Sequence, residues 1–239
     1  MKTYTSFQEL DALGEGLAKK YTGNTHRWNS SCFDIEGFIT DFLKLPILYE
    51  AFAEDDPSKI GFLSDGITPL IVYRAGKKTP VVFPKDTIVI ESFLQRSDES
   101  GRRRFTLAHE AAHFILSRHV PMQTACFHNE YDHEFHYSGE ELAKMFSLNE
   151  TLTNRLGVAV LMPPFLVGRA LKKYNNGQPI VYYTEGVFAP DTKIRLQSMS
   201  DALGVSYSAL INRLRELRLL ECRPIEEYID HALFPKASI

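Results

Sequence analysis

The sequence has few of the features that mark secreted proteins, membrane proteins or strongly basic nucleic-acid-binding proteins. Its three cysteines, Cys32, Cys126 and Cys222, are odd in number and far apart, which argues against a disulfide framework and favours reduced thiols. The first residues lead into a polar segment instead of an apolar signal core. No uninterrupted apolar run reaches the length of a membrane span. We therefore expect a cytoplasmic protein that has no membrane partner.

The chain also lacks a strong charge of either sign, internal repeats and low-complexity tracts. Its net charge is −3 over 239 residues, so no basic field of the kind that attracts nucleic acid is present. Hydrophobic residues make up 44% and charged residues 24%, which is ordinary for a globular protein. This length suits one large domain or one domain with an appendage.

One stretch carries a chemical signature. Residues 109–113 read H-E-x-x-H within an apolar run, and residues four apart lie on one face of a helix. Such a helix would place the imidazoles of His109 and His113 side by side, where both can bind one zinc ion. Glu110 would lie on the neighbouring stripe, where it can take a proton from metal-bound water. A buried helix with two incidental histidines is the alternative, but Leu107 and Ile115 already supply an apolar face.

The third ligand decides the mechanistic class, and the residues alone leave it open. His119 is spaced like the third histidine of H-E-x-x-H-x-x-G-x-x-H, but Leu116 occupies the glycine position where the chain would leave the helix. On a continuing helix, His119 would be rotated off the ligand face. Glu150 is a candidate from a later helix, with Asn154 on the same face to hold a ligand in place. By spacing alone, its competitors are Glu140, Glu141, Asp132, His133 and His136.

Around the motif, the patterns predict an α+β protein. Helices are expected over residues 6–23, 31–45, 150–161, 165–174, 196–203 and 209–220, and the motif helix is expected to include residues 104–116, with Asp98 or Ser100 as its N-cap. Segments rich in β-forming residues, separated by turn signals, predict a small antiparallel sheet from residues 60–63, 67–73, 80–83 and 87–90. Residues 120–140 lack periodicity and are interpreted as a loop over the site, and the residues after 175 as a linker.

Two blocks resemble the ImmA/IrrE family of zinc metallo-endopeptidases. Residues 104–113, RFTLAHEAAH, are similar to the family's R-F-T-L-A-H-E-x-x-H. Residues 150–163, ETLTNRLGVAVLMP, are similar to E-x-x-A-N-x-F-A-x-x-L-L-M-P. The second block departs at Thr153, which stands for Ala, and at Leu156-Gly157, which stand for Phe-Ala. The segment between the two blocks is longer than is usual for the family.

The resemblance implies a zincin-like catalytic domain over residues 31–175, preceded by a helical segment over residues 1–30. It implies that His109, His113 and Glu150 bind Zn²⁺ and that Glu110 is the general base of a gluzincin-like endopeptidase. Asn154 would support the ligands from behind. It further implies a protein substrate, a helix-turn-helix repressor of a phage, conjugative element or stress regulon.

Residues 176–239 form a separate predicted segment with a helix-turn-helix-like pattern. Arg213, Arg215 and Arg218 on its second helix favour DNA contact, but Glu216 and Glu221 dilute the charge. We therefore expect this segment to pack on the catalytic domain or to dock the substrate, in preference to binding DNA directly. A non-catalytic regulator that binds DNA or a repressor through this segment is the alternative function.

Two further groups carry weaker expectations. Cys126, His128, His133 and His136 match no structural zinc pattern and are interpreted as lining the substrate groove. For the oxyanion, Tyr131, Tyr137 and His136 stay equal candidates. The basic run Arg102–Arg104, near a helix start, should have a carboxylate partner.

Overall fold

The computed structural model describes residues 6–25, 30–56, 59–119 and 139–233. It divides the chain between Pro163 and Pro164 into two compact units. Within the described residues, no helix has the length and apolarity that crossing a membrane requires.

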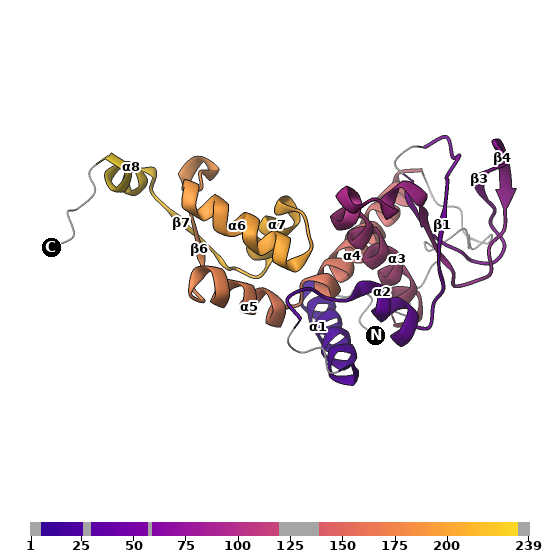
Figure 1. Ribbon diagram of the computed structural model, residues 1–239, viewed down its shortest axis with the longest axis horizontal. Coiled ribbons are helices and arrows are strands. Elements are labelled where there is room, and N and C mark those ends of the chain that lie inside the picture. Colours follow the sequence, from indigo (N-terminus) through magenta and orange to yellow (C-terminus); the bar gives the residue numbers. More distant parts are fainter. Residues whose placement is uncertain (1–5, 26–29, 57–58, 120–138, 234–239) are drawn as a thin grey trace. The chain divides into compact units, whose positions relative to one another are not determined.

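Unit 1 holds the first helices, five strands and the helix that carries the H-E-x-x-H motif (Figure 1). In chain order its elements are α1 (Phe7–Asn24), α2 (Ile35–Gly37), η1 (Phe38–Phe42), β1 (Ile47–Glu50), β2 (Gly61–Leu63), β3 (Leu70–Arg74), β4 (Lys77–Val81), β5 (Ile88–Glu91), η2 (Ser92–Gln95), η3 (Ser97–Glu99), α3 (Ser100–His119) and α4 (Gly139–Leu161).

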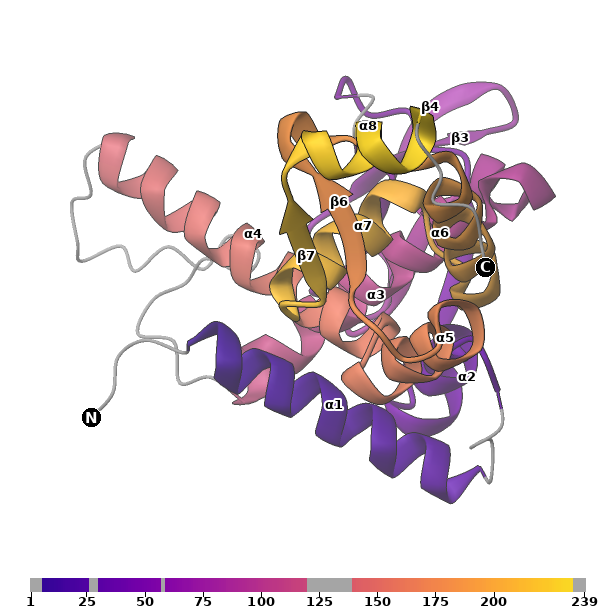
Figure 2. The same ribbon diagram turned by 90° about the vertical axis from the view of Figure 1, so that its left-hand side faces the viewer.

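The amino-terminal helix α1 is built into this unit and packs along α4 (Figure 2). Ser6 and Glu9 form a capping box at its start. Gly14 allows the close approach, because a Cβ atom there would lie 2.6 Å from the Cβ of Ala159. An ion pair between Asp11 and Arg155 also joins the two helices.

The segment after α1 forms an aromatic cluster. The helix predicted over residues 31–45 is shorter than expected, consisting of α2 and a π-helical turn, η1. Tyr21 packs edge-on against Phe33 and Phe38, and its hydroxyl donates to Asp34 across 2.9 Å. These contacts attach the segment that carries α2 to α1.

The predicted antiparallel sheet is in fact two smaller sheets, one of them mixed. The central strand β5 pairs parallel with β1 and antiparallel with β2, in the order β1-β5-β2. The second sheet is the antiparallel hairpin β3-β4. The expectation of one antiparallel sheet was wrong because β1, which follows Pro46, joins through a parallel pairing (Ile47 opposite Ile88) that leaves no turn signal. Phe62, Val72 and Val89 pack together in the core between these strands.

The motif helix α3 lies between the mixed sheet and α4. It contacts β2 and β5 on one side and α4 on the other. Its start carries the basic run, and the expected carboxylate partners are present: Arg103 faces Glu36 at 3.3 Å and Arg102 faces Glu99 at 4.0 Å. Arg104 instead donates to the carbonyl oxygen of Phe33 across 2.6 Å. The basic run therefore links the start of α3 to α2, to η3 and to the segment before α2.

Unit 2 contains α5 (Pro164–Asn175), β6 (Ile180–Tyr183), η4 (Thr184–Gly186), α6 (Pro190–Leu203), α7 (Tyr207–Glu216), β7 (Leu220–Arg223) and α8 (Ile225–Leu233). The residues predicted as a linker after 175 include β6, which pairs parallel with β7. The turn between α6 and α7 follows the prediction, with Gly204 left-handed at φ 66° and Ser206 capping α7. Arg213 is completely buried and pairs with Glu216 at 3.1 Å.

The predicted domain limits at residues 30 and 175 remain a prediction. The compact units have their boundary at Pro163, and α1 is part of unit 1.

Candidate metal centre

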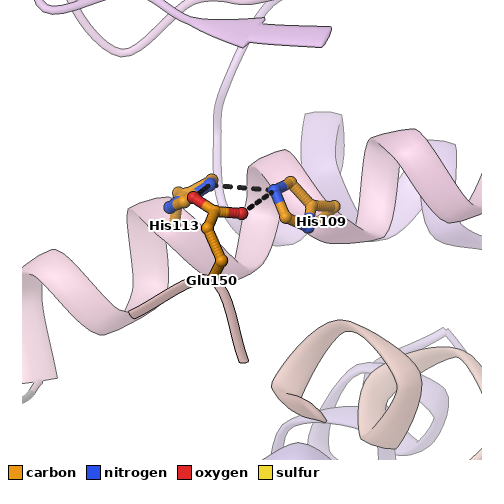
Figure 3. Close-up of side chains that lie close together, drawn as sticks. All are labelled: His109, His113 and Glu150. Atoms are coloured by element: carbon orange, nitrogen blue, oxygen red, sulfur yellow. Dashed lines mark hydrogen bonds and ion pairs between the residues drawn. The ribbon is translucent and has the colours of Figure 1, made fainter. Parts of the chain in front are cut away.

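The two motif histidines lie on one face of a continuous helix, as predicted. α3 runs through Phe114, Ile115 and Leu116 to His119 without a break. The imidazole rings of His109 and His113 are edge to face with centroids 4.6 Å apart. Their Nε2 atoms approach to 2.9 Å, so both point at the same position in space (Figure 3).

Glu150 on α4 completes the cluster from the opposite side. Its Oε2 lies 3.3 Å from Nε2 of His109, and its Oε1 lies 3.5 Å from Nε2 of His113 (Figure 3). The close crossing of α3 and α4 makes this reach sufficient. Two turns after Glu150, a Cβ atom on Gly157 would lie 3.1 Å from the carbonyl oxygen of Ala108, so the helix backbones nearly touch.

The donor set and its spacing fit a tetrahedral metal ion. The ligand atoms of His109, His113 and Glu150 all lie within 4.8 Å of one another, so these residues could hold a metal ion. Ligand atoms held about 2.1 Å from a tetrahedral ion lie about 3.4 Å apart. The two nitrogen–oxygen separations match this value, and the nitrogen–nitrogen separation is somewhat shorter. Three protein ligands leave a fourth position open, as in catalytic zinc sites.

The residues behind the histidines favour the tautomer that a metal needs. Asn154 on α4 places its Oδ1 atom 2.9 Å from Nδ1 of His109, so this nitrogen can donate its proton to the amide oxygen. A neutral His109 then presents the lone pair of Nε2 to the cluster. Thr153 stands behind His113 in the same way, at 3.4 Å from Nδ1.

The electrostatics of the cluster favour a positive charge. Burial by itself lowers the pKa of His109. The hydrogen bond with Glu150 and the charges of Glu110 and Glu150 outweigh burial, so the pKa of His109 is raised. A metal ion would satisfy the same two carboxylates without protonating the imidazoles.

Glu110 sits beside this cluster in a far more enclosed position than Glu150. Its residue surface is only 6% exposed, whereas the side chain of Glu150 is 54% exposed. Burial raises the pKa of Glu110 to about 7, although the charge of His109 and a hydrogen bond from the main-chain N–H of Leu63 act in the opposite direction. A carboxyl group that titrates near neutral pH can both accept and return a proton.

The side chains of His109, Glu110, His113 and Glu150 line one open cleft of about 320 Å³. Its other wall comes from β2 and the segments next to it, through Lys59, Gly61, Phe62 and Thr68. The sequence analysis did not single out these four residues. Gly61 carried the one available signal, because a glycine inside a strand often marks a close approach by another group.

The cluster is drawn from residues whose side chains the structure describes, and the remaining sequence candidates are not among these residues. His119 is the last residue of α3, and Glu140 and Glu141 lie in the first turn of α4. The other candidates fall outside the described residues: Cys126, His128, Tyr131, Asp132, His133, His136 and Tyr137.

Comparison with known proteins identifies a family. No curated protein is significantly similar to the chain. The family model of the IrrE N-terminal-like domain, peptidase family M78, matches residues 92–215, which is more than half of the chain and includes His109, His113 and Glu150. The chain therefore belongs to the M78 peptidases, the ImmA/IrrE family, which indicates a metallopeptidase with a protein substrate.

Proposed function

We propose that this protein is a zinc-dependent endopeptidase of the zincin-like, gluzincin type. One observation carries the proposal: the nitrogens of His109 and His113 and the carboxylate of Glu150 converge in a cleft that Glu110 also lines. A structural zinc site would use four protein ligands and would have no need of a buried, unligated carboxyl group beside it.

In this proposal, His109, His113 and Glu150 hold the zinc ion, and Asn154 fixes the ring of His109. A zinc ion held there would polarise a peptide carbonyl and acidify a water molecule. Glu110 would accept a proton from the attacking water and return it to the leaving amine. Its position inside the cleft wall shields the carboxyl from bulk solvent.

The substrate is proposed to bind as an extended segment along β2. This strand forms one edge of the mixed sheet and contributes Gly61 and Phe62 to the cleft. An added strand would gain main-chain hydrogen bonds while its side chains reach the neighbouring surface. Backbone recognition of this kind explains how a protein chain, and not a small molecule, would reach the metal.

By the resemblance of its two motif blocks, we propose a helix-turn-helix repressor as the substrate and the cytoplasm as the location. The test uses the repressor encoded closest to this protein's gene. Zinc-loaded protein should cut it at one site, a chelator should stop the cleavage, and added zinc should restore it. Cleavage that continues at full rate in the chelator would refute the zinc mechanism.

A second candidate function has one observation in its favour, the α6–turn–α7 unit. Arg215 and Arg218 are exposed at its carboxyl-terminal end, as in a helix-turn-helix that contacts phosphates. A non-catalytic regulator would bind DNA or a repressor through this unit. A gel shift with salt titration separates the functions, because phosphate contacts weaken steeply as salt rises. DNA binding with that salt dependence, together with no cleavage, would favour this candidate.

A further inference from the structure

β2 is an edge strand that packs against the motif helix, and one main-chain group on its free side is used by that helix. Ile60 accepts a hydrogen bond from the N–H of Glu91, and Ser64 donates to the carbonyl of Thr87, so these residues turn their main-chain groups toward β5. In an antiparallel pair this direction alternates, so Gly61 and Leu63 turn theirs outward. The outward N–H of Leu63 donates a hydrogen bond to the carboxyl group of Glu110.

Gly61 leaves the space that this carboxyl group occupies. A Cβ atom at Gly61 would lie 2.5 Å from Oε1 of Glu110 and 2.7 Å from Cγ2 of Thr106. Both distances are shorter than real Cβ contacts. The lack of a side chain on the strand and the position of the carboxyl group on α3 are therefore complementary.

The main-chain conformation gives no other reason for a glycine here. Among the described residues, the glycines with positive φ are Gly66, Gly76, Gly177, Gly186 and Gly204. Gly61 is not one of them, so its φ is one that any residue adopts. A glycine within a strand weakens the strand, since it adds chain entropy and packs no side chain. The loss of strand stability is offset by the space that the glycine leaves for the side chains of Glu110 and Thr106.

We propose that Gly61 is a positioning residue for Glu110. The missing side chain of Gly61 and the N–H of Leu63 form a cradle that holds the Glu110 carboxyl group at the cluster of His109, His113 and Glu150. The inference rests on the proposed function, in which Glu110 moves protons. It adds a residue that neither binds the metal nor transfers a proton. This residue acts by fixing the position of the Glu110 carboxyl group.

The size of the effect follows from the contact. An ordinary Cβ–oxygen contact is about 3.4 Å, so Gly61→Ala must move the carboxyl group by about 1 Å. A displacement of this size at a reacting group costs about 100-fold in rate. The change should appear in kcat. Zinc affinity should stay within about threefold of the wild type, because Glu110 is not one of the three ligands. KM should also stay within about threefold, because the added Cβ atom points at Glu110 and Thr106 and leaves the main-chain groups of β2, where the substrate would pair, in place.

The first experiment compares four zinc-loaded, full-length variants on the repressor encoded nearest the gene: Gly61→Ala, Glu110→Asp, the double variant and Gly168→Ala. Asp is one methylene shorter, so Gly61→Ala should cost less than about threefold when Glu110→Asp is already present. Gly168→Ala is the matched control, since a Cβ atom there meets nothing within 4 Å. An equal fall from Gly61→Ala with and without Glu110→Asp, or a fall confined to KM, would overturn the proposal.

A second readout needs no activity. In the metal-free protein, Gly61→Ala should lower the denaturation midpoint by about 5 °C through overpacking. With Glu110→Asp present, less than half of this shift should remain, the rest being the contact with Thr106. Equal shifts in both backgrounds would contradict a cradle for Glu110. If the wild type cleaves no repressor, the proposed function fails, and this coupling still decides the role of Gly61.

Discussion

Because the carboxyl group of Glu110 is buried, we predict that it makes the free energy of unfolding of the metal-free protein depend on pH. In the metal-free protein its pKa is raised from 4.5 to about 7, chiefly by burial. A raised pKa of the folded state gives stability that is present below pH 4.5 and is lost as the pH rises through 7. The difference of 2.5 units corresponds to about 3 kcal/mol at 1.36 kcal/mol per unit.

Glu110→Gln removes this titration and keeps the shape of the protonated carboxyl group. In the presence of a chelator, the two proteins should have similar free energies of unfolding near pH 4.5. At pH 8 the variant should be more stable by about 3 kcal/mol, because it buries no ionised group. Urea denaturation at the two pH values measures the difference. Titrations of groups that do not interact with Glu110 cancel between the two proteins, but that of His109 does not, because the charge of Glu110 raises its pKa.

Zinc provides the internal control for this experiment. A bound cation lowers the pKa of a neighbouring carboxyl group, so zinc loading should shrink the gap between the two proteins at pH 8. A gap that is the same at pH 4.5 and pH 8 without metal would refute the reasoning. It would mean that Glu110 ionises in the folded protein as easily as it does in the unfolded chain.

Two further predictions concern the framework and the ligands. Gly14→Ala should destabilise the protein by about 1–3 kcal/mol, because its Cβ atom would overlap Ala159, whereas Gly16→Ala, where a Cβ meets nothing within 4 Å, should be neutral or slightly stabilising. Equal thermal midpoints for the two variants would contradict the packing of α1 on α4. Asn154→Ala should weaken zinc binding by about 10–100-fold, because it frees the ring of His109; competition with a chromophoric chelator measures this, and unchanged affinity would rule out the orienting role.

The motif helix was predictable because its signal is local. The H-E-x-x-H spacing and the apolar residues around it specify both the helix and the side on which His109 and His113 lie, and α3 continues unbroken through residues 114–116 as expected. Glu150 was different. Spacing left several acidic residues and histidines equal, and the resemblance of the second block pointed to Glu150, which the structure brings to within 3.5 Å of both histidines.

Non-local contacts account for what the sequence did not predict. The parallel pairing of β1 with β5 joins residues that no turn connects, so the sheet was expected to be antiparallel. The strands β6 and β7 were missed for the same reason, since their pairing spans two helices. The cleft wall at Lys59, Gly61 and Thr68 also depends on how β2 meets α3, which no local pattern records.

The most direct test of the central claim is a comparison of wild type and Glu110→Gln, both loaded with zinc, on the repressor encoded nearest the gene. Metal content and cleavage are measured on the same samples. We predict one zinc ion per chain in both proteins, cleavage by the wild type and none by the variant. Cleavage by Glu110→Gln at the wild-type rate, with zinc bound, would contradict the role of Glu110 and the mechanism built on it.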